Sequence, residues 1–393
     1  MTQPVYIVSA TRTPIGAFQG ALSSLRAPEL GAIAIKGALE RAKLTGADIE
    51  EVFFGNVLTA GIGQAPARQA AIFGGLPNTV PATTIGKVCG SGLQAVVFGA
   101  RAVALGDAEL VMTGGMESMS NAPYYLEKAR SGYRMGNGTL IDGMIHDGLW
   151  DPYNNVHMGT CGDACAKEFN YSREAQDEYA KESYRKALAA QKEGLFDAEI
   201  TPVSVAQKKG DPTIVKADEG PTKGDPAKFP ALRPAFSKDG TITAANASPI
   251  NDGASALILA SEAAVKKHKL EPLARIVGYA NAAQAPEKFT TAPAVAIENV
   301  IKKTGITKDS IDLFEINEAF AVVAMACAKL TNIDLAKVNV RGGAVALGHP
   351  IGASGARVLT TLLYALKDQK AKRGLATLCI GGGEAVALVV ERA

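Results

Sequence analysis

The chain has 393 residues, of which 47% are hydrophobic and 20% charged, and this composition is typical of a globular protein with two or three domains or a duplicated unit. Its 41 Lys and Arg residues against 39 Asp and Glu residues leave a net charge of +2, with no long run of one sign. The sequence therefore lacks the basic stripe that nucleic-acid binding requires.

Three features favour a cytoplasmic protein without a membrane segment. The longest uninterrupted apolar stretch, residues 319–328, is shorter than the ~18 to 20 residues that span a bilayer. The N-terminus lacks the basic and long apolar segments of a signal peptide. Five cysteines, an odd number, do not suggest a disulfide framework.

Strands alternate with helices from the N-terminus onward. Residues 5–10 (VYIVSA) predict the first strand, and residues 34–54 predict an amphipathic helix and then a strand. Residues 89–107 open with glycines and continue as a helix, and residues 109–115 predict a short apolar strand that ends in glycines. Units of this kind indicate a mainly parallel sheet.

Residues 121–245 interrupt this alternation. Six prolines between Thr201 and Phe236 exclude long helices and central strands from that stretch. One helix is predicted inside the insertion, at residues 174–194. Residues 247–261 are expected to return to the first half as a strand and a helix.

The second half then repeats the first. Residues 296–316 align without a gap with the first helix and strand, and residues 350–368 align with the glycine-led helix. We therefore expect two duplicated α/β domains whose corresponding loops meet at one cleft. The predicted domains are an N-terminal domain (1–120 and 246–271), an inserted loop domain (121–245) and a C-terminal domain (272–393).

Cys89 lies between TTIGKV and GSG, at a strand-to-helix turn. A helix N-terminus favours thiolate and can lower a cysteine pKa from ~8.5 to about 3.5–7.5. Cys89 is therefore a candidate nucleophile, and a small buried residue in a glycine turn is the alternative. By the repeat, His349 occupies the equivalent turn of the second half, where a thiol and an imidazole can meet. A structural histidine is the alternative there.

Two further positions follow strands of the second half. Asn317 and Glu318 lie at a carboxyl end, where α/β sheets place ligand groups, although a helix cap explains them equally well. Cys379 leads into glycines 381–383, whose N–H groups can turn toward a developing oxyanion. A packed strand cysteine is the alternative. Cys161 and Cys165 have no second ligand pair, so no metal site is expected.

Four segments together resemble the thiolase family, and within it the biosynthetic acetoacetyl-CoA thiolases, over essentially the whole chain. They are VCGSG around Cys89, NEAFA at 317–321, GGAVALGHPIGASGAR at 342–357 and CIGGG at 379–383. The resemblance implies the thiolase fold, with two duplicated βα domains packed as αβαβα layers. It also implies reversible condensation of two acetyl-CoA to acetoacetyl-CoA and CoA by a ping-pong route. No metal or redox cofactor is expected, since CoA is itself substrate and product.

The resemblance also implies a role for each site residue. Cys89 accepts the acyl group, and His349 takes its proton. Cys379 removes a proton from the methyl carbon of the second acetyl-CoA. Asn317, through a held water, and His349 stabilise the enolate. The N–H groups of Cys89 and Gly381 bind the oxyanion at the acylated cysteine.

The same resemblance predicts the substrate contacts. His157 and Met158 would pack against the acyl end and pantetheine, with Met158 leaving room for a short acyl group only; ordinary packing is the alternative. Other positions that line the CoA tunnel in relatives are Leu149, Phe236, Ala244, Ser248, Ala319 and Phe320. Residues 118–136 resemble the family's tetramerisation loop, so a homotetramer is expected.

Two positions depart from the family pattern. Lys223 is the one basic residue close to the expected nucleotide contacts. Glu384 stands where most relatives carry an uncharged residue, and its carboxylate is expected to raise the pKa of Cys379 by repulsion.

Two alternatives stay open. One is a broader-chain 3-ketoacyl-CoA thiolase of fatty-acid β-oxidation. The other is a non-catalytic CoA-ester or lipid-binding member, which would not need both Cys89 and Cys379. Ketoacyl synthases share the fold but rely on a cysteine with two histidines, and NEAFA replaces the first of these here.

Overall fold

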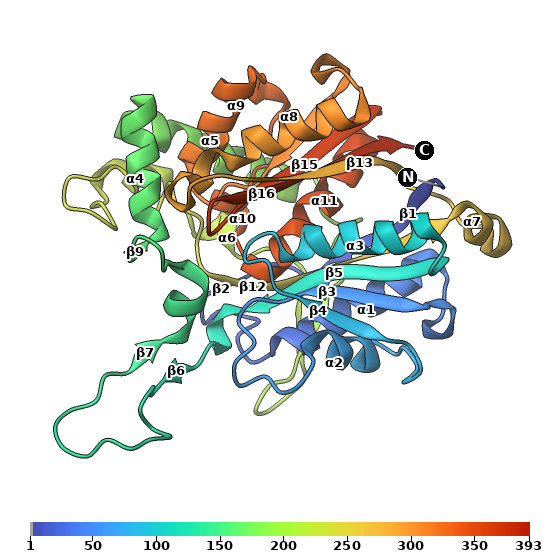
Figure 1. The fold of residues 1–393 in the computed structure, drawn as a ribbon, viewed down its shortest axis with the longest axis horizontal. Coiled ribbons are helices and arrows are strands. Elements are labelled where there is room, and N and C mark those ends of the chain that lie inside the picture. Colours follow the sequence, from blue (N-terminus) through green and yellow to red (C-terminus); the bar gives the residue numbers. More distant parts are fainter. Residues whose placement is uncertain (1–2) are drawn as a thin grey trace.

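A ten-stranded sheet runs through the whole molecule in the computed structural model, which describes residues 3–393 (Figure 1). Its strands are β1 (Val5–Arg12), β2 (Gly16–Ala17), β3 (Glu51–Gly55), β4 (Ala82–Ile85), β5 (Leu110–Ser118), β12 (Asn251–Ser261), β13 (Ala274–Ala283), β14 (Leu313–Ile316), β15 (Arg373–Ile380) and β16 (Glu384–Arg392). The order is β14-β15-β16-β13-β1-β12-β5-β3-β4, with β2 paired to β12. Tyr6 and Ile7 of β1 pair with Arg275 and Ala274 of β13. This pairing, in the middle of the strand order, joins the strands of the two halves into one sheet.

Helices cover the sheet in three layers. The outer helices are α1 (Ala27–Ala42) and α2 (Pro66–Phe73) on one half, and α8 (Ala292–Thr304) and α9 (Ala321–Thr331) on the other. The central helices α3 (Ser91–Leu105) and α11 (Ile351–Asp368) lie between the two halves (Figure 1). One apolar core surrounds the central helices, and each outer layer of helices packs on the sheet through a core of its own. The αβαβα arrangement predicted from the sequence is confirmed.

The central helices cross through glycines. A Cβ atom on Gly92 of α3 would lie 2.8 Å from the backbone nitrogen of Ala356, and one on Gly355 of α11 would lie 2.3 Å from that of Leu93. Since neither position has room for a side chain, the two backbones approach closely. This crossing places the N-termini of α3 and α11 beside each other, and these are the ends that carry Cys89 and His349.

The internal repeat is visible as matching elements. The first block forms the end of α1 and β3, and its copy forms α8 and β14. Even the short 3-10 turns between helix and strand correspond, at Gly46–Asp48 and Lys308–Ser310. The glycine-led helices are α3 and α11, and the strands that follow them are β5 and β15.

The prediction of a mainly parallel sheet is wrong. Only the ladders β3–β4, β3–β5 and β14–β15 are parallel in the described part of the chain, and the others are antiparallel. The reason lies in how each half closes. β16 follows β15 directly through the turn Gly381–Gly383, and a hairpin connection of this length requires antiparallel strands. β12 likewise returns antiparallel to β5.

The insertion contains more structure than predicted. The expected helix is α5 (Arg173–Lys192), but α4 (Met158–Phe169) precedes it and was not predicted. The proline-rich stretch holds only the short elements β10 (Val203–Val205), β11 (Thr213–Val215) and α6 (Gly220–Lys223), as expected. The returning segment is a buried strand, β12, and its helix α7 (Glu262–His268) begins one residue beyond the predicted range.

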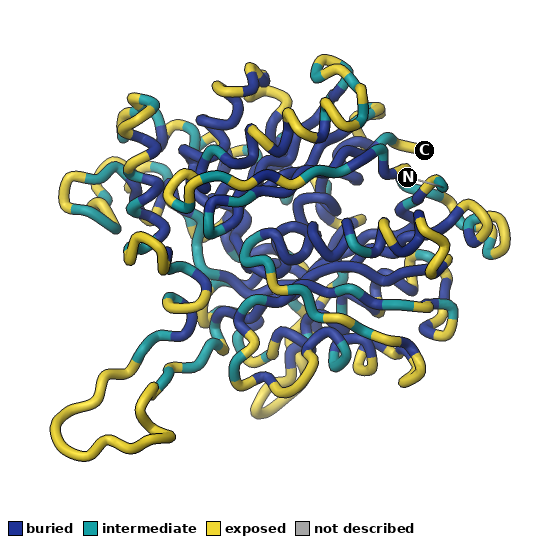
Figure 2. The backbone as a smooth tube through the Cα atoms, in the orientation of Figure 1, coloured by how far each residue is buried: buried dark blue, intermediate teal, exposed yellow. Residues whose placement is uncertain are grey.

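A two-stranded arm projects from the body of the molecule (Figures 1 and 2). It consists of β6 (Tyr124–Tyr125), β7 (Ile141–Asp142) and the loop between them. Residues 126–140 are all exposed, and Met135 is 94% exposed. The predicted tetramerisation loop therefore lies largely in this arm.

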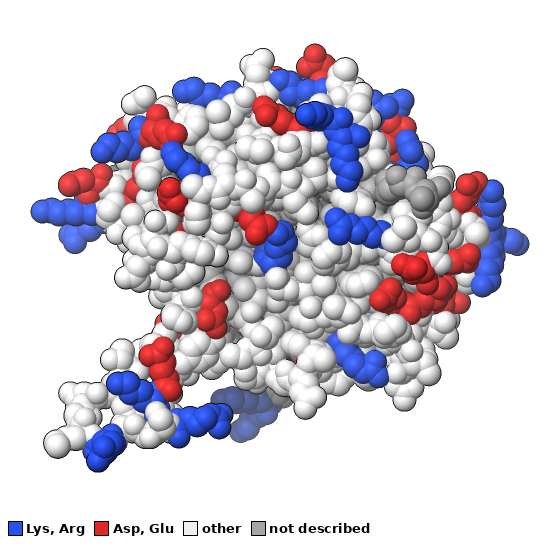
Figure 3. All heavy atoms as spheres, viewed as in Figure 1, with Lys and Arg blue, Asp and Glu red and all other residues white. Residues whose placement is uncertain are grey.

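The charges follow the sequence composition. On the face shown in Figure 3, basic and acidic side chains are interspersed among wide uncharged areas. By length and composition, residues 88–105 are the one stretch in the described chain that could cross a membrane, and 72% of it is buried inside the protein as α3 and the turn before it. A core helix explains this stretch.

One buried carboxylate ties the halves together below the helix crossing. Glu117, at the end of β5, is fully buried. It accepts hydrogen bonds from the Asn56 side chain (2.7 Å) and from the backbone N–H groups of Val57 (3.1 Å), Leu58 (3.2 Å) and Gly352 (2.9 Å). Burial nevertheless raises its pKa to about 7.

Replacing Glu117 with alanine is expected to lower the free energy of unfolding by about 2–4 kcal/mol, since the four buried donors would lose their acceptor. Urea denaturation followed by circular dichroism measures the change. The exposed Glu40 of α1 provides the control, because Glu40→Ala should alter stability by less than about 0.5 kcal/mol. Equal stability of the two variants would show that Glu117 does not connect the halves.

Candidate active site

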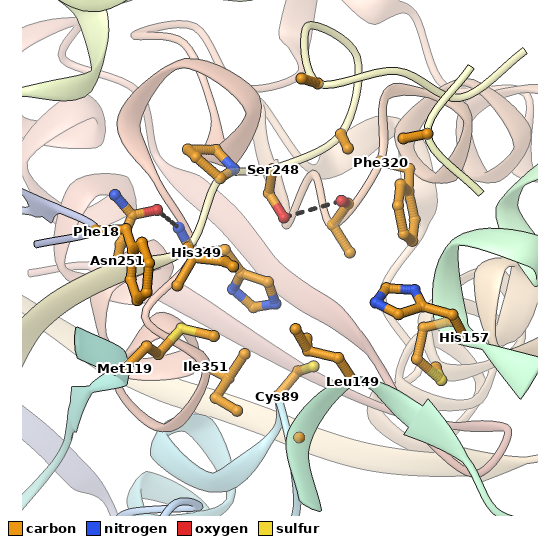
Figure 4. A pocket seen from close by; sticks show the side chains of 18 of the residues that line it. Phe18, Cys89, Met119, Leu149, His157, Ser248, Asn251, Phe320, His349 and Ile351 are labelled. Atoms are coloured by element: carbon orange, nitrogen blue, oxygen red, sulfur yellow. Dashed lines mark hydrogen bonds between the residues drawn. The ribbon is translucent and has the colours of Figure 1, made fainter. Parts of the chain in front are cut away.

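A cavity of about 630 Å³ opens between the two halves and the insertion (Figure 4). All eight residues predicted to contact CoA line it, together with Cys89, His349 and Gly381. Asn317 and Cys379 do not reach its surface and are 1% and 0% exposed. Figure 4 shows the His349 ring, the Cys89 sulfur and the His157 ring around the same cavity, with Phe320 next to His157.

A strained turn between β4 and α3 presents Cys89. Val88 has a positive φ of 42°, which is costly for a β-branched residue, and Ser91 accepts a hydrogen bond from the N–H of Lys87 at 2.8 Å. A Cβ atom on Gly90 would lie 2.3 Å from the Ile380 side chain. The end of β15 therefore packs directly on the Cys89 turn, which brings the Cys379 segment next to it.

The Cys89 thiol is not acidic. Burial raises its pKa to about 11, and the N–H groups of Gly381 and of Cys89 itself offset only part of that rise. The lowered pKa expected at the helix N-terminus is therefore not found, because burial raises the pKa more than the two N–H groups lower it. A neutral thiol needs a base before it can act as a nucleophile.

The His349 imidazole has the form that such a base requires. Its Nδ1 lies 2.6 Å from the Ser354 hydroxyl, which lies 2.9 Å from the carbonyl oxygen of Pro350. Because a carbonyl oxygen only accepts, the serine hydroxyl donates to it, and Nδ1 donates to the serine. Nε2 is then left without a proton. Burial, and then the positive charge of Arg357, lower the His349 pKa to about 3.

The backbone of His349 is fixed from the first half of the chain. Its N–H donates to Asn251 at 2.9 Å, as Figure 4 shows, and the Asn251 amide donates to the carbonyl oxygen of Gly16 at 2.9 Å. Gly348 has a φ of 115°, and a Cβ atom there would lie 2.5 Å from the Asn251 side chain. Only glycine fits at this contact.

Asn317 and Glu318 have different tasks. The Asn317 Nδ2 atom lies 3.5 Å from Nε2 of His349, and its Oδ1 has no hydrogen-bond partner in residues 3–393. The Glu318 carboxylate accepts hydrogen bonds from Tyr179 (2.9 Å), Ser183 (2.8 Å) and the backbone of Val345 (3.1 Å), among others. α9 begins after Phe320 without a side-chain cap, so neither residue caps it.

Cys379 lies behind the cavity wall, at the end of β15. Burial raises its pKa well above the usual cysteine value, and the neighbouring Cys89 thiol adds to the rise. The two sulfur atoms are thus close enough to influence each other. Cys379 is both a packed strand cysteine and a neighbour of the candidate nucleophile.

The glycine turn after β15 faces the same point. Gly381 lines the cavity, and a Cβ atom on it would lie 3.4 Å from Val88 and 3.6 Å from Met158. Its N–H donates a hydrogen bond to the Cys89 sulfur and thereby lowers the pKa of that thiol. Gly383 has a φ of 87°, and a Cβ atom there would lie 2.4 Å from the Gln284 carbonyl oxygen, so the turn requires glycine.

Glu384 does not have the expected effect on Cys379. Its carboxylate forms an ion pair with Lys87, in the turn before Cys89. On β16 it stands opposite Ile380, while Ala385 stands opposite Cys379. The charge of Glu384 is thus compensated by a residue of the other half. The Cys379 pKa is raised by burial and by neighbouring thiols.

Aromatic side chains form the other wall. The rings of His157 and Phe236 are stacked with centroids 4.5 Å apart, and Phe236 meets Phe320 edge-on at 6.1 Å. His157 also accepts a hydrogen bond from the N–H of Gly159 at 3.1 Å, which caps α4. Ser248 donates to the Ala319 carbonyl oxygen at 2.9 Å (Figure 4).

Some lining residues were missed by sequence reasoning. Phe18, Met119 and Ile351 also line the cavity, and Figure 4 places them around Cys89 and His349. Met119 directly follows β5, and the carboxyl end of a strand is the signal that could have identified it. Phe18 lies in a loop and gives no such signal. Lys223 is at the cavity as well, 3.1 Å from Glu219.

The remaining thiols offer no metal site. Cys161, Cys165 and Cys327 are buried and unbridged. In residues 3–393 no group of three or more His, Cys, Asp or Glu side chains is arranged to hold a metal ion.

A thiol and an imidazole with a free nitrogen line one cavity between duplicated α/β halves, and an enzyme that transfers acyl groups can use such a pair. Two family models match the chain, the thiolase N-terminal domain over residues 5–263 and the thiolase C-terminal domain over residues 270–392. The chain belongs to the thiolase family.

The chain aligns with similar proteins over nearly their whole length, and these have related names. The cytosolic acetyl-CoA acetyltransferase ERG10 of Gibberella zeae is 52% identical over 389 residues, which are 99% of this chain and 98% of that protein. The acetyl-CoA acetyltransferase of Cupriavidus necator is 54% identical over 99% of both chains. That of Allochromatium vinosum is 51% identical over 100% of both.

Proposed function

We propose that this acyltransferase condenses two molecules of acetyl-CoA to acetoacetyl-CoA and CoA through an acetyl group on Cys89. The observation that carries the proposal is that the Cys89 thiol and the His349 imidazole line one cavity, and that the Cys379 thiol is buried behind its wall as a neighbour of Cys89. The similar proteins named acetyl-CoA acetyltransferase support the choice of substrate.

In the first half-reaction the Cys89 sulfur attacks the thioester carbon of acetyl-CoA while Nε2 of His349 takes the thiol proton. The N–H groups of Cys89 and Gly381 hold the resulting oxyanion. The C–S bond to CoA breaks, and Cys379 gives its proton to the leaving CoA sulfur. The products are acetyl-Cys89, free CoA, a protonated His349 and a Cys379 thiolate.

In the second half-reaction the Cys379 thiolate takes a proton from the methyl carbon of another acetyl-CoA. The enolate oxygen is stabilised by protonated His349 and by Asn317 through a held water. The new carbanion attacks the acetyl carbon, and the Cys89–carbon bond breaks. Cys89 recovers its proton from His349, so every group returns to its starting state.

The high thiol pKa values suit this cycle. A thiol with a raised pKa rests in the protonated form, and Cys379 must rest as a proton donor for the leaving CoA. Once deprotonated, the same thiol is a stronger base than an exposed cysteine. The acid and base roles thus follow from burial.

The proposal extends to cofactors, location and assembly. CoA carries the acyl groups, so we infer no metal or redox cofactor. We infer a cytoplasmic enzyme, as is a similar protein named cytosolic. The exposed arm with Tyr124, Leu126, Met135 and Leu140 would join subunits into a homotetramer, because an apolar arm of this kind is costly to leave in water.

Direct detection of the products tests the function. The purified chain is incubated with acetyl-CoA, and acetoacetyl-CoA and CoA are quantified by mass spectrometry. Thiolysis of C4 and C10 3-ketoacyl-CoA is then compared, and a clear preference for C4 is expected. Equal rates would indicate a broader 3-ketoacyl-CoA thiolase, and no turnover with either would indicate a binding protein.

Truncating Met158 to alanine is expected to relax the preference for short chains. Met158 is 9% exposed and lies at the cavity wall near Gly381, so its removal makes space where a longer acyl chain would extend. We expect kcat/KM for C6 relative to C4 substrate to rise about tenfold.

The matched control is Met325→Ala. Met325 is also 9% exposed but packs in a separate apolar core that includes part of α5. It should leave the C6 to C4 ratio unchanged. If both variants change the ratio equally, Met158 does not set the chain length.

A further inference from the structure

Two turns, one from each half of the chain, meet at the Cys89 sulfur. The Cys89 turn (residues 87–90) leads into α3, and the glycine turn (residues 381–383) joins β15 to β16. The N–H of Gly381 donates a hydrogen bond to the Cys89 sulfur. The two N–H groups proposed to hold the oxyanion, those of Cys89 and Gly381, are therefore placed by different halves, and their separation depends on how the two turns are joined.

Neither turn fixes its own conformation. Val88 in the Cys89 turn has a φ of 42°, a strained value that persists only where surrounding contacts enforce it. Gly382 and Gly383 both have a φ of 87°, and successive glycines can adopt many other conformations. Within its own half, the glycine turn is held by a hydrogen bond of 2.9 Å from the N–H of Gln284 to the Gly383 carbonyl oxygen. Its placement against the Cys89 turn requires contacts between the halves.

An ion pair between Lys87 and Glu384 provides such a contact. Lys87 opens the Cys89 turn, and Glu384 directly follows the glycine turn. At the other end of the glycine turn, Ile380 packs on Gly90, where a Cβ atom would lie 2.3 Å from its side chain. No other residue at positions 86–91 or 380–384 carries a charge. The glycine turn is thus held on the Cys89 turn at both ends, by one apolar contact and one ion pair.

Neither stability nor substrate binding accounts for this ion pair. The Lys87 and Glu384 side chains are 22% and 39% exposed, and ion pairs of such exposure add little to the free energy of unfolding. Neither residue lines the cavity. Donors that stabilise an oxyanion, in contrast, must be held within about 0.5 Å of their working position. The ion pair lies where it can set the position of one donor relative to the other.

We propose that Lys87 and Glu384 are positioning residues for acyl transfer: their ion pair holds the glycine turn against the Cys89 turn, so that the oxyanion donors of the two halves stay aimed at one point. The inference deepens the proposed function and rests on those N–H groups holding the oxyanion. Because the pair acts from outside the cavity, its loss affects the rate of acyl transfer and not the binding of acetyl-CoA.

Neutralising either partner tests the inference. The acetylation of Cys89 in Lys87→Met and in Glu384→Gln is followed by intact mass in single-turnover experiments at increasing acetyl-CoA concentration. Each variant should lower the saturating rate about fivefold, because a displaced donor stabilises the oxyanion less. The half-saturating concentration should change less than twofold. A raised half-saturating concentration with an unchanged saturating rate would show that the pair binds substrate, and would overturn the inference.

Exchanging the two charges shows whether the ion pair itself is responsible. The double variant Lys87→Glu with Glu384→Lys keeps opposite charges between the turns, and its saturating rate should return to within about twofold of the wild type. Lys87→Glu alone brings two carboxylates together and should be slower than Lys87→Met. If the double variant is as slow as the neutral variants, the two charges do not act through each other and the inference is wrong.

The matched control is an ion pair at the opposite end of the same hairpin. Arg373, at the start of β15, contacts Glu391 of β16 at 2.6 Å, and the two side chains are 25% and 21% exposed. Arg373→Met therefore removes a comparable ion pair without touching either turn, and it should be acetylated at the wild-type rate. Equal losses in Arg373→Met and Lys87→Met would mean that any loosening of the hairpin slows acylation, which contradicts a specific role.

Amide hydrogen exchange examines the glycine turn without turnover. The N–H groups of residues 381–384 should exchange several-fold faster in the two neutral variants, and at the wild-type rate in the charge-exchanged variant and in Arg373→Met. If the wild type forms no acetoacetyl-CoA but exchange changes in this way, the proposed function fails and the tie between the turns stands. If condensation occurs but the neutral variants are acetylated like the wild type, the inference is overturned whatever the exchange shows.

Discussion

Replacing Cys89 with serine is expected to abolish acetyl transfer, with kcat for condensation falling by more than about 10⁴-fold. The side chain keeps its place at the turn before α3. A serine hydroxyl, however, is far less acidic than a thiol, and a His349 imidazole whose pKa is lowered to about 3 is too weak a base to activate it. The measurement is acetoacetyl-CoA formation, together with the intact mass after incubation with acetyl-CoA.

The wild type should gain one acetyl group, located on the peptide that contains Cys89, and Cys89→Ser should gain none. Cys161→Ser serves as the control, because Cys161 is buried in α4 and does not line the cavity. It should be acetylated like the wild type. Acetylation of Cys89→Ser at another cysteine would show that the nucleophile has been misassigned.

Replacing Cys379 with alanine is expected to separate the two half-reactions. Acetyl-Cys89 should still form, since Cys89 and His349 are intact, although more slowly because the leaving CoA loses its proton donor. Condensation should fall by about 10²–10⁴-fold, the usual contribution of a general base. A burst of free CoA followed by almost no acetoacetyl-CoA is the expected time course.

Cys327→Ala is the matched control for this variant. Cys327 is fully buried in α9 and close enough to Cys379 to affect its pKa, so it tests whether simply losing a buried thiol slows condensation. It should retain most activity. If both variants lose condensation equally, Cys379 contributes packing rather than a proton.

The sequence was most informative about the pairing of Cys89 with His349. Neither residue is decisive alone, but the repeat gives them equivalent turns, and equivalent turns of duplicated halves meet. The duplicated α/β fold could be predicted as well, because periodicity identifies each helix and strand locally and the repeat shows that the same series occurs twice. What periodicity could not provide was strand direction, since a short glycine turn and a crossover helix both follow an apolar strand.

The protonation states could not be predicted. A cysteine at a helix N-terminus suggests a lowered pKa, yet the cavity around Cys89 is lined from α4, the turn after β15 and the loop before β12, all far away in the sequence. Glu384 shows the same limit. Its partner Lys87 is 297 residues away, and only the folded chain reveals that the charge is compensated.

The glycine crossing of α3 and α11 has a consequence for how the molecule is made. During synthesis α3 leaves the ribosome long before α11 exists, while several of its apolar side chains, among them Val96 and Val103, belong to the core shared with the later helix. The nascent first half therefore exposes an apolar face of α3. These side chains stay without their partner until translation delivers α11, so the first half cannot complete its core on its own.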